Sequence, residues 1–174
     1  MQKGLATLEI IFAVMIIAVL TNVAVPNATR IIDRAALDYE TKRLYSELRF
    51  VQSMSRSKTI KETGMSGNKD ITKNIDDRKF ILVIDKSKTS YQVFRGIDTN
   101  KKALREPHYL SNGVTISFKY SVPKNTITFN GLGNATNTAG TALSNTLILT
   151  SRLNKKNYIK FDSVGRIRSS LTDN

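Results

Sequence analysis

MQKGLATLEIIFAVMIIAVLTNVAVP, residues 1–26, is the stretch of this 174-residue chain that decides its fold. From Leu5 to Val25 the residues are almost all apolar, and a helix of this length spans about 32 Å, which matches the hydrocarbon core of a bilayer. Glu9 lies inside the run, where a carboxylate costs about 2.5–3.5 kcal/mol at mid-membrane and is expected to be functional. The sequence therefore predicts a membrane helix that carries one functional acidic residue, Glu9.

A cleaved signal peptide is the alternative interpretation, with Lys3 as its basic region and small residues near Ala24 as its cleavage site. The apolar run is longer than a usual signal-peptide core, and Glu9 would be a costly residue there. We therefore favour the membrane helix. A Glu9 that is merely tolerated near the membrane interface is the alternative to a functional one.

The string KGLATLE, residues 3–9, before a long apolar helix resembles the prepilin signature of type IV pilins and type II secretion pseudopilins. The resemblance implies that a prepilin peptidase cuts between Gly4 and Leu5 and methylates the new N-terminus at Leu5. It also implies that Glu9 serves filament assembly by meeting the terminal amine of a neighbouring subunit, and that Pro26 is the helix-bending proline. The chain departs from the family at Leu5, where phenylalanine is usual.

This resemblance also implies the partners and the location of the chain. The partners are other pilin subunits, the prepilin peptidase and the inner-membrane assembly machinery. The chain would cross the inner (cytoplasmic) membrane once, with its globular domain outside the cytoplasm, and would join a pilus or pseudopilus after assembly. In a low-dielectric filament core an unpaired carboxylate or amine is unfavourable, so Glu9 would set the register of subunits.

The resemblance implies a leader (1–4) and a transmembrane or filament-core helix (5–26). The pattern of residues predicts an amphipathic helix (27–58) and a β-rich globular domain (59–174) after them. In the amphipathic part, hydrophobic residues and one threonine recur every three or four positions, which predicts a helix with one stripe on the domain. A coiled-coil seam is the alternative, but the stretch is short for one. The stripe consists of Leu37, Thr41, Leu44, Leu48 and Val51.

The second half of the chain has the period of β-strands. KFILVI and YQVFR flank a turn and predict a hairpin, and five further short strands follow: GVTISFKY, NTITFN, NTLILTS, NYIKFD and GRIRSS. Residues 58–78 and the stretch GLGNATNTAGTA (131–142) are polar and are predicted to be loops. We expect an α+β fold in which the long helix packs on about seven antiparallel strands, arranged as two packed sheets. The order of these strands resembles the GspH/FimT branch of pilin-like proteins.

The last hairpin, YIKFDSVGRIRSS, predicts a site for anions. A three-residue loop that ends at Gly165 would set Lys160 opposite Arg168 and send both outward with Arg166 and Tyr158. Like charges that face each other across a ladder are unfavourable unless an anion neutralises them. The remaining members of the predicted basic cluster are Arg152, Lys155 and Lys156.

Residues Gly165–Arg168 also resemble the GRxR motif of DNA-binding FimT-type minor pilins, which implies contacts to the DNA phosphate backbone and a role in DNA uptake during natural transformation. A solvated strand whose arginines only aid solubility is the alternative. A structural pseudopilin of a type II secretion system, with no DNA binding, is the alternative function.

The composition limits other functions. The chain has 27 basic and 14 acidic residues, a net charge of +13, no cysteine and the single histidine His108. The charge favours anionic partners. One histidine gives little material for metal binding or for acid–base catalysis, so we expect no enzyme, no metal and no cofactor.

Overall fold

The computed structural model describes residues 3–63, 79–96 and 101–171. Its first element is a single long helix, α1 (Lys3–Thr63), which contains Pro26. The helix continues beyond residue 58, so the predicted loop at 58–63 was wrong. The sequence KTIKET there contains no glycine or proline, and the next glycine along the chain is Gly64. The rest of the predicted loop, 64–78, lies outside the described residues.

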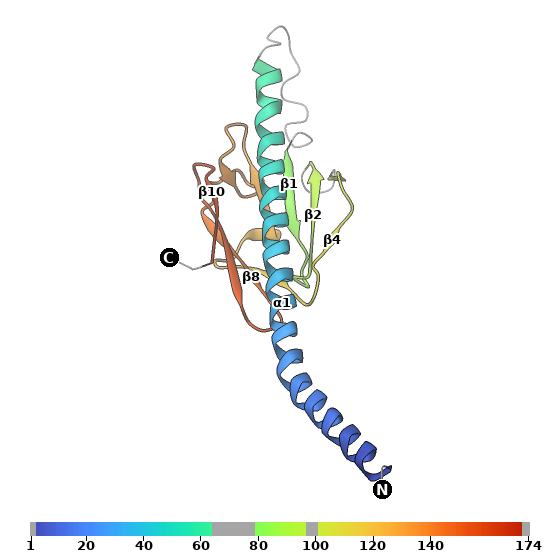
Figure 1. Ribbon diagram of the computed structural model, residues 1–174. Coiled ribbons are helices and arrows are strands. Elements are labelled where there is room, and N and C mark those ends of the chain that lie inside the picture. The colour runs from blue at the N-terminus through green and yellow to red at the C-terminus, as the bar shows by residue number, and fades with distance from the viewer. Residues whose placement is uncertain (1–2, 64–78, 97–100, 172–174) are drawn as a thin grey trace.

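The two halves of α1 have different surroundings. The N-terminal half projects away from the domain and curves, whereas the C-terminal half crosses the two sheets (Figure 1). Large apolar side chains on the projecting half are exposed, among them Ile11 at 67% and Met15 at 62%. Among the described residues, α1 is the one helix with a stretch long and apolar enough to cross a membrane, by length and composition. Free in water, this surface would be strongly unfavourable.

The predicted stripe of the second half faces the core. All five residues are buried, with Leu44, Leu48 and Val51 fully so and Leu37 and Thr41 nearly so. The Thr41 hydroxyl donates to the Leu37 carbonyl at 2.7 Å, which satisfies the one polar side chain of the stripe within the helix. The spacing of three and four residues thus places the stripe against the sheets, as predicted.

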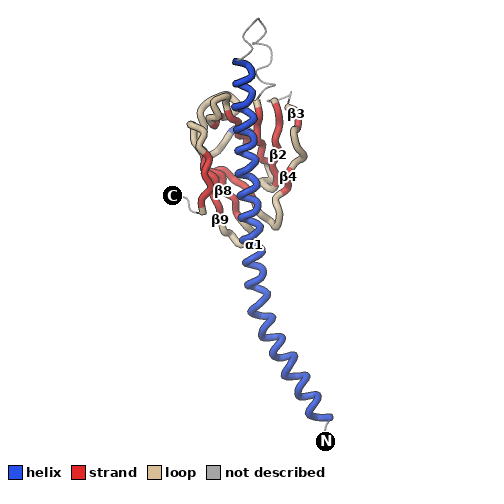
Figure 2. The backbone as a smooth tube through the Cα atoms, turned by 45° about the horizontal axis from the view of Figure 1, so that its top comes forward, coloured by secondary structure: helices blue, strands red, loops and turns tan. Residues whose placement is uncertain are grey.

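The strands form two antiparallel sheets. The first has the order β3 (Lys102–Ala103), β2 (Ser90–Arg95), β1 (Phe80–Ile84), β6 (Thr126–Phe129) and β7 (Ala135–Thr136), with β4 (His108–Tyr109) also paired to β2. The second has the order β10 (Ile167–Ser170), β9 (Lys156–Phe161), β8 (Asn145–Thr150) and β5 (Thr115–Phe118). Figures 1 and 2 show α1 lying over both sheets, which confirms the predicted α+β class.

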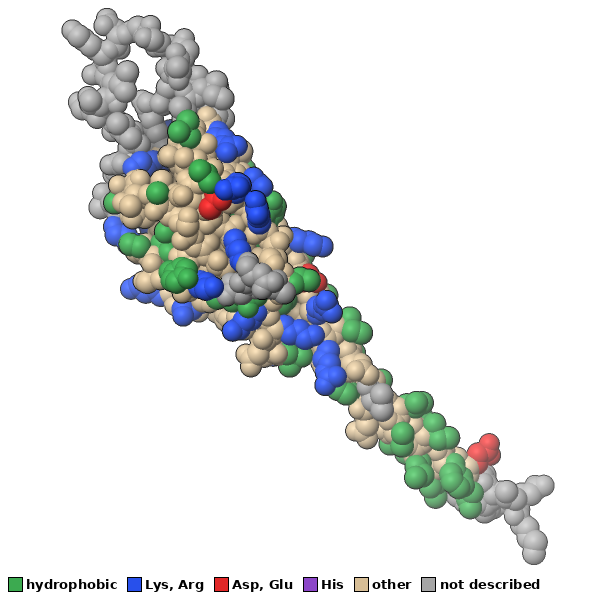
Figure 3. Space-filling view, turned by 90° about the vertical axis from the view of Figure 1, so that its left-hand side faces the viewer, with side chains coloured by type: hydrophobic (Ala, Val, Ile, Leu, Met, Phe, Trp, Pro, Cys, Tyr) green, Lys and Arg blue, Asp and Glu red, His purple; other side chains and the backbone are tan. Residues whose placement is uncertain are grey.

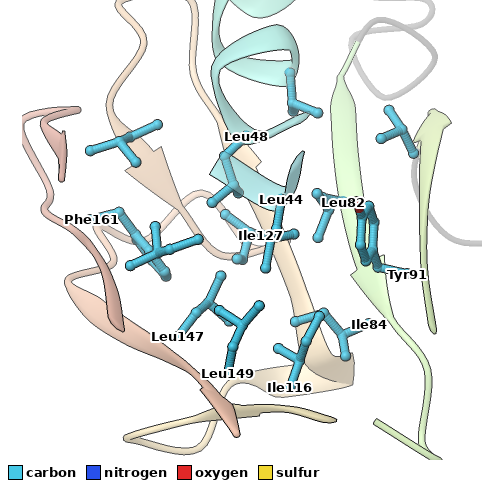
Figure 4. Packing of buried hydrophobic residues seen from close by; sticks show 14 of the residues in the cluster. Leu44, Leu48, Leu82, Ile84, Tyr91, Ile116, Ile127, Leu147, Leu149 and Phe161 are labelled. Carbon is cyan, nitrogen blue, oxygen red and sulfur yellow. The ribbon is translucent and has the colours of Figure 1, made fainter. Parts of the chain in front are cut away.

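The core lies where the helix meets both sheets. Leu44 and Leu48 from α1 point toward Ile127 of the first sheet and Leu147 of the second (Figure 4). Each of these side chains is fully buried. Burial of this size is worth about 1.5–3 kcal/mol for each such side chain, so the helix and both sheets are held as one unit.

The strand count exceeds the prediction. The seven predicted strands are present, and β3, β4 and β7 are additional two-residue strands. A pair of residues has no alternating pattern to detect, so sequence periodicity could not reveal them. One of them, β7, lies within the predicted loop at 131–142, where Asn130 and Asn137 accept hydrogen bonds from nearby backbone amides.

Candidate anion-binding face and assembly helix

The β9–β10 hairpin has the predicted turn and register. Gly165 has a φ of +82°, and the Gly165 amide donates to the Asp162 carbonyl at 3.0 Å. Across the ladder, Phe161 pairs with Ile167 and Lys160 with Arg168. The left-handed conformation at the last loop residue is the one that glycine adopts without steric cost. The predicted hairpin geometry is therefore confirmed.

Gly165 also makes a close contact that the sequence did not indicate. A Cβ atom at this position would lie 2.2 Å from the carbonyl oxygen of Gly133, in the loop between β6 and β7. The buried Gln52 side chain of α1 donates to both loops, at 2.8 Å to the Gly133 oxygen and 2.6 Å to the Gly165 oxygen. Gln52 thereby fixes both loops to the helix. The only sequence signal for the contact of Gln52 with the two loops is that Gln52 follows Val51, the last residue of the core stripe.

The outer face of the second sheet carries the predicted basic side chains. Along β9 the buried Asn157, Ile159 and Phe161 alternate with Lys156, Tyr158 and Lys160, which point outward. We call the outward residues Lys156, Tyr158, Lys160 and Arg168 the β9 face. Figure 3, which views the molecule from this side, shows Lys and Arg side chains spread over the domain and few acidic ones.

Arg166 has a partner on its own hairpin. Its Nε donates to Asp162 Oδ2 at 2.9 Å, and its backbone amide donates to Asp162 Oδ1 at the same distance. Burial opposes ionisation of Asp162, but the hydrogen bonds from Arg166 outweigh it and hold the pKa of that carboxyl below its ordinary value. Arg166 therefore secures the turn, which leaves it less free for an anion than Arg168.

The basic cluster is divided between the two ends of β9. Arg152 and Lys155 lie in the exposed turn between β8 and β9. Lys156 begins β9, and Lys160 lies near its other end beside Arg168. The predicted basic residues therefore do not form one compact cluster but are spread along the length of β9.

The predicted assembly residues lie on the projecting half of α1. Gly4 and Leu5 are in its first turns, described for their backbone only, and Glu9 is exposed among apolar neighbours. Pro26 lies inside the helix, and the Thr29 hydroxyl donates to its carbonyl at 2.9 Å. Proline lacks the amide hydrogen of a helical bond. Pro26 occupies the exposed stretch of α1 between the apolar half and the domain.

A second polar cluster, which sequence reasoning missed, fastens β4 and the flanking loops to α1. Glu40 is fully buried, and its carboxylate contacts His108 Nε2 at 2.7 Å, the Ser111 hydroxyl at 2.7 Å and the Ser111 amide at 3.0 Å. Two turns further along α1, Glu47 forms an ion pair with Arg105, with 2.6 Å between Arg105 Nη1 and Glu47 Oε1. Burial raises the pKa of Glu40, but the hydrogen bonds from His108 and Ser111 hold it below its ordinary value.

No group of three or more His, Cys, Asp or Glu side chains that could hold a metal ion occurs among the described residues. The cluster around Glu40 contains one histidine and one carboxylate. Its hydrogen bonds join α1 to the segment that contains His108 and Ser111, so the cluster serves to hold these parts of the fold together.

Comparison with known proteins gives relatives by structure alone. No family model matches the chain, and no curated protein matches it. The type IV minor pilin FimU of Pseudomonas aeruginosa PAO1 superposes with a TM-score of 0.53 at 14% identity, covering 79% of this chain and 90% of FimU. The minor pseudopilin EpsH of the type 2 secretion system of Vibrio cholerae superposes with a TM-score of 0.51 at 11% identity, covering 76% of this chain and 94% of EpsH.

The chain therefore has the type IV pilin-like fold, one long N-terminal helix packed on two antiparallel sheets. This is the fold of both a minor pilin and a minor pseudopilin.

Proposed function

We propose that the chain is a minor pilin-type subunit, anchored by α1 in the inner (cytoplasmic) membrane, processed by a prepilin peptidase and assembled into a filament. The observation that carries this proposal is the projecting half of α1. Its large apolar side chains are exposed, so lipid or neighbouring helices must cover them. The prepilin-like residues 3–9 lie at the free end of this half-helix. We propose no catalytic activity and no cofactor for the chain.

Processing is the first test of this proposal. When the full chain is co-expressed with a prepilin peptidase, we expect loss of residues 1–4 and one added methyl group at Leu5, read by intact mass. Gly4→Val should block cleavage, because a subsite shaped for glycine has no room for a branched side chain. Ala18→Val, which adds volume within the apolar run, should be cleaved normally.

Assembly is measured by shearing filaments from cells that carry a type IV pilus machinery and probing for the processed chain. Glu9→Ala should be processed and yet be lost from the sheared fraction, because the carboxylate would no longer pair in the filament core. A chain that is never cleaved, or a Glu9→Ala variant that assembles normally, would contradict the proposal.

We further propose that the β9 face binds the phosphate backbone of extracellular DNA, which would make the subunit a DNA-capturing pilin. One observation favours this over a structural pseudopilin: Lys160 and Arg168 pair directly across the ladder. This pairing places two positive charges side by side on the outer face, where one phosphate group can contact both of them. A guanidinium also suits phosphate through its paired donors.

A salt titration tests this second proposal. The full chain in nonionic detergent micelles should bind duplex or single-stranded DNA with an affinity that falls steeply as salt rises, because phosphate contacts release counterions. Lys160→Ala/Arg168→Ala should weaken binding about tenfold or more. The matched control Lys86→Ala/Lys102→Ala removes two exposed cations from the first sheet and should have little effect. Equal losses in both variants would indicate binding by net charge alone.

A further inference from the structure

We propose that the β9 face selects single-stranded over duplex polynucleotide, with Tyr158 stacking on one base between phosphate contacts at Lys156 and Lys160. This inference rests on the proposed nucleic-acid binding and specifies its ligand. It follows from three features: the order of the side chains along β9, the neighbours of Tyr158, and the lack of a groove-reading element over β9 and β10 among the described residues.

The order of side chains places an aromatic ring between two cations. Lys156, Tyr158 and Lys160 occupy successive outward positions of β9. At about 3.3 Å per residue, the two lysine backbones lie about 13 Å apart, with Tyr158 midway. An extended polynucleotide laid along the strand can therefore contact both ends of this row through phosphate while a base lies over the ring. Arg168, across from Lys160, adds a second cation at one end.

The neighbours of Tyr158 across the sheet are uncharged. It pairs with Ile148 on β8 and with Ser170 on β10. The ring is half-buried, so its orientation is supported by the sheet while part of it faces solvent. A ring held in this way loses little conformational freedom when a base stacks on it, and every base offers a π-face for such stacking.

The shape of the face allows base contacts to a single strand but only phosphate contacts to a duplex. In the described part of the chain, α1 packs on the inner side of this sheet and no other α-helix occurs that could lie over β9 and β10 on the outer side (Figure 1). Reading the major groove takes a protruding helix or β-ribbon, and bases in a duplex are already stacked on one another. A sheet with aromatic and basic side chains is instead the kind of surface on which unstacked bases are bound.

The test compares strand types and tyrosine variants. Fluorescence anisotropy would follow a labelled oligothymidylate, and the duplex of the same length, titrated with the full chain in nonionic detergent micelles at low salt. We expect the single strand to bind more tightly. Tyr158→Leu, which keeps an apolar side chain against Ile148, should weaken single-strand binding about 5- to 100-fold through loss of stacking and change duplex binding little. Tyr158→Phe should bind like the unmodified chain.

Tyr109→Leu is the matched control, since Tyr109 is an exposed tyrosine on β4 of the other sheet. Thermal unfolding of each variant would show that the sheet is intact. Equal binding of both strand types together with an unaffected Tyr158→Leu variant would overturn the inference and leave the proposed DNA binding standing. No binding of either nucleic acid at low salt would overturn both.

Discussion

Replacing Glu40 by alanine should lower the free energy of unfolding by about 3 kcal/mol. The carboxylate is fully buried and accepts hydrogen bonds from Ser111 and a contact from His108. Its removal leaves the Ser111 amide without a buried acceptor and His108 Nε2 without its hydrogen-bond partner. The loss lies near the lower end of the range for buried pairs, because the His108 side chain is partly exposed and water can replace its lost partner. Urea unfolding of the full chain in detergent micelles, followed by near-UV circular dichroism, measures it.

Glu106→Ala is the control for this experiment. Glu106 is an exposed glutamate two residues before His108, so its removal makes the same change of charge at the same loop. A surface substitution of this kind should alter stability by no more than about 0.5 kcal/mol. Similar effects of the two substitutions would mean that Glu40 contributes only through the net charge of the domain.

The pH dependence of the Glu40 effect has a definite sign. The pKa of Glu40 lies below its ordinary value of 4.5 in the folded chain. Its carboxylate therefore stabilises the fold fully above pH 4.5, and this contribution is lost as the pH falls through the folded pKa. The stability difference between the unmodified chain and Glu40→Gln should be constant near neutral pH and shrink in acid. A difference that grew in acid would contradict the assigned charge state.

Features that repeat along the chain could be predicted from the sequence. The apolar run predicted the helix, while the stripe that includes Leu44 and Leu48 and the alternation in β9 each predicted the correct element and its buried face. The β9–β10 register was also predictable, because the position of Gly165 fixes the loop and the loop fixes the pairing.

Features that depend on single long-range pairs could not be predicted in this way. His108 and Glu40 are 68 residues apart in the chain, and Gln52 and Gly165 are 113 apart. The local sequence pattern of a helix does not predict which polar residue on its buried side will contact a loop that is distant in the chain. The ion pair between Arg166 and Asp162 is local by contrast, because these residues flank the three-residue loop that ends at Gly165.

Gly165→Ala should destabilise the chain by about 3 kcal/mol or more, through two separate effects. A side chain in the left-handed region, at a φ of +82°, costs about 1–2 kcal/mol. The added Cβ would also lie 2.2 Å from the Gly133 oxygen, and this neighbour is backbone, so the two loops must separate. Separation breaks at least one of the buried hydrogen bonds of Gln52, and an unsatisfied buried polar group costs about 1–3 kcal/mol.

Gly140→Ala separates these two effects. Gly140 has a φ of +84°, nearly the same as Gly165, but a Cβ there would meet no atom within 4 Å. Its substitution should therefore cost only the conformational part, about 1–2 kcal/mol. The extra loss of stability in Gly165→Ala then measures the contact between the two loops. This extra loss should largely disappear when both glycine variants are made in a Gln52→Ala background, because the hydrogen bonds from Gln52 to the loops are already gone there. Equal losses for the two glycines in the unmodified background would mean that the loops move apart freely and that Gln52 does not hold the hairpin to α1.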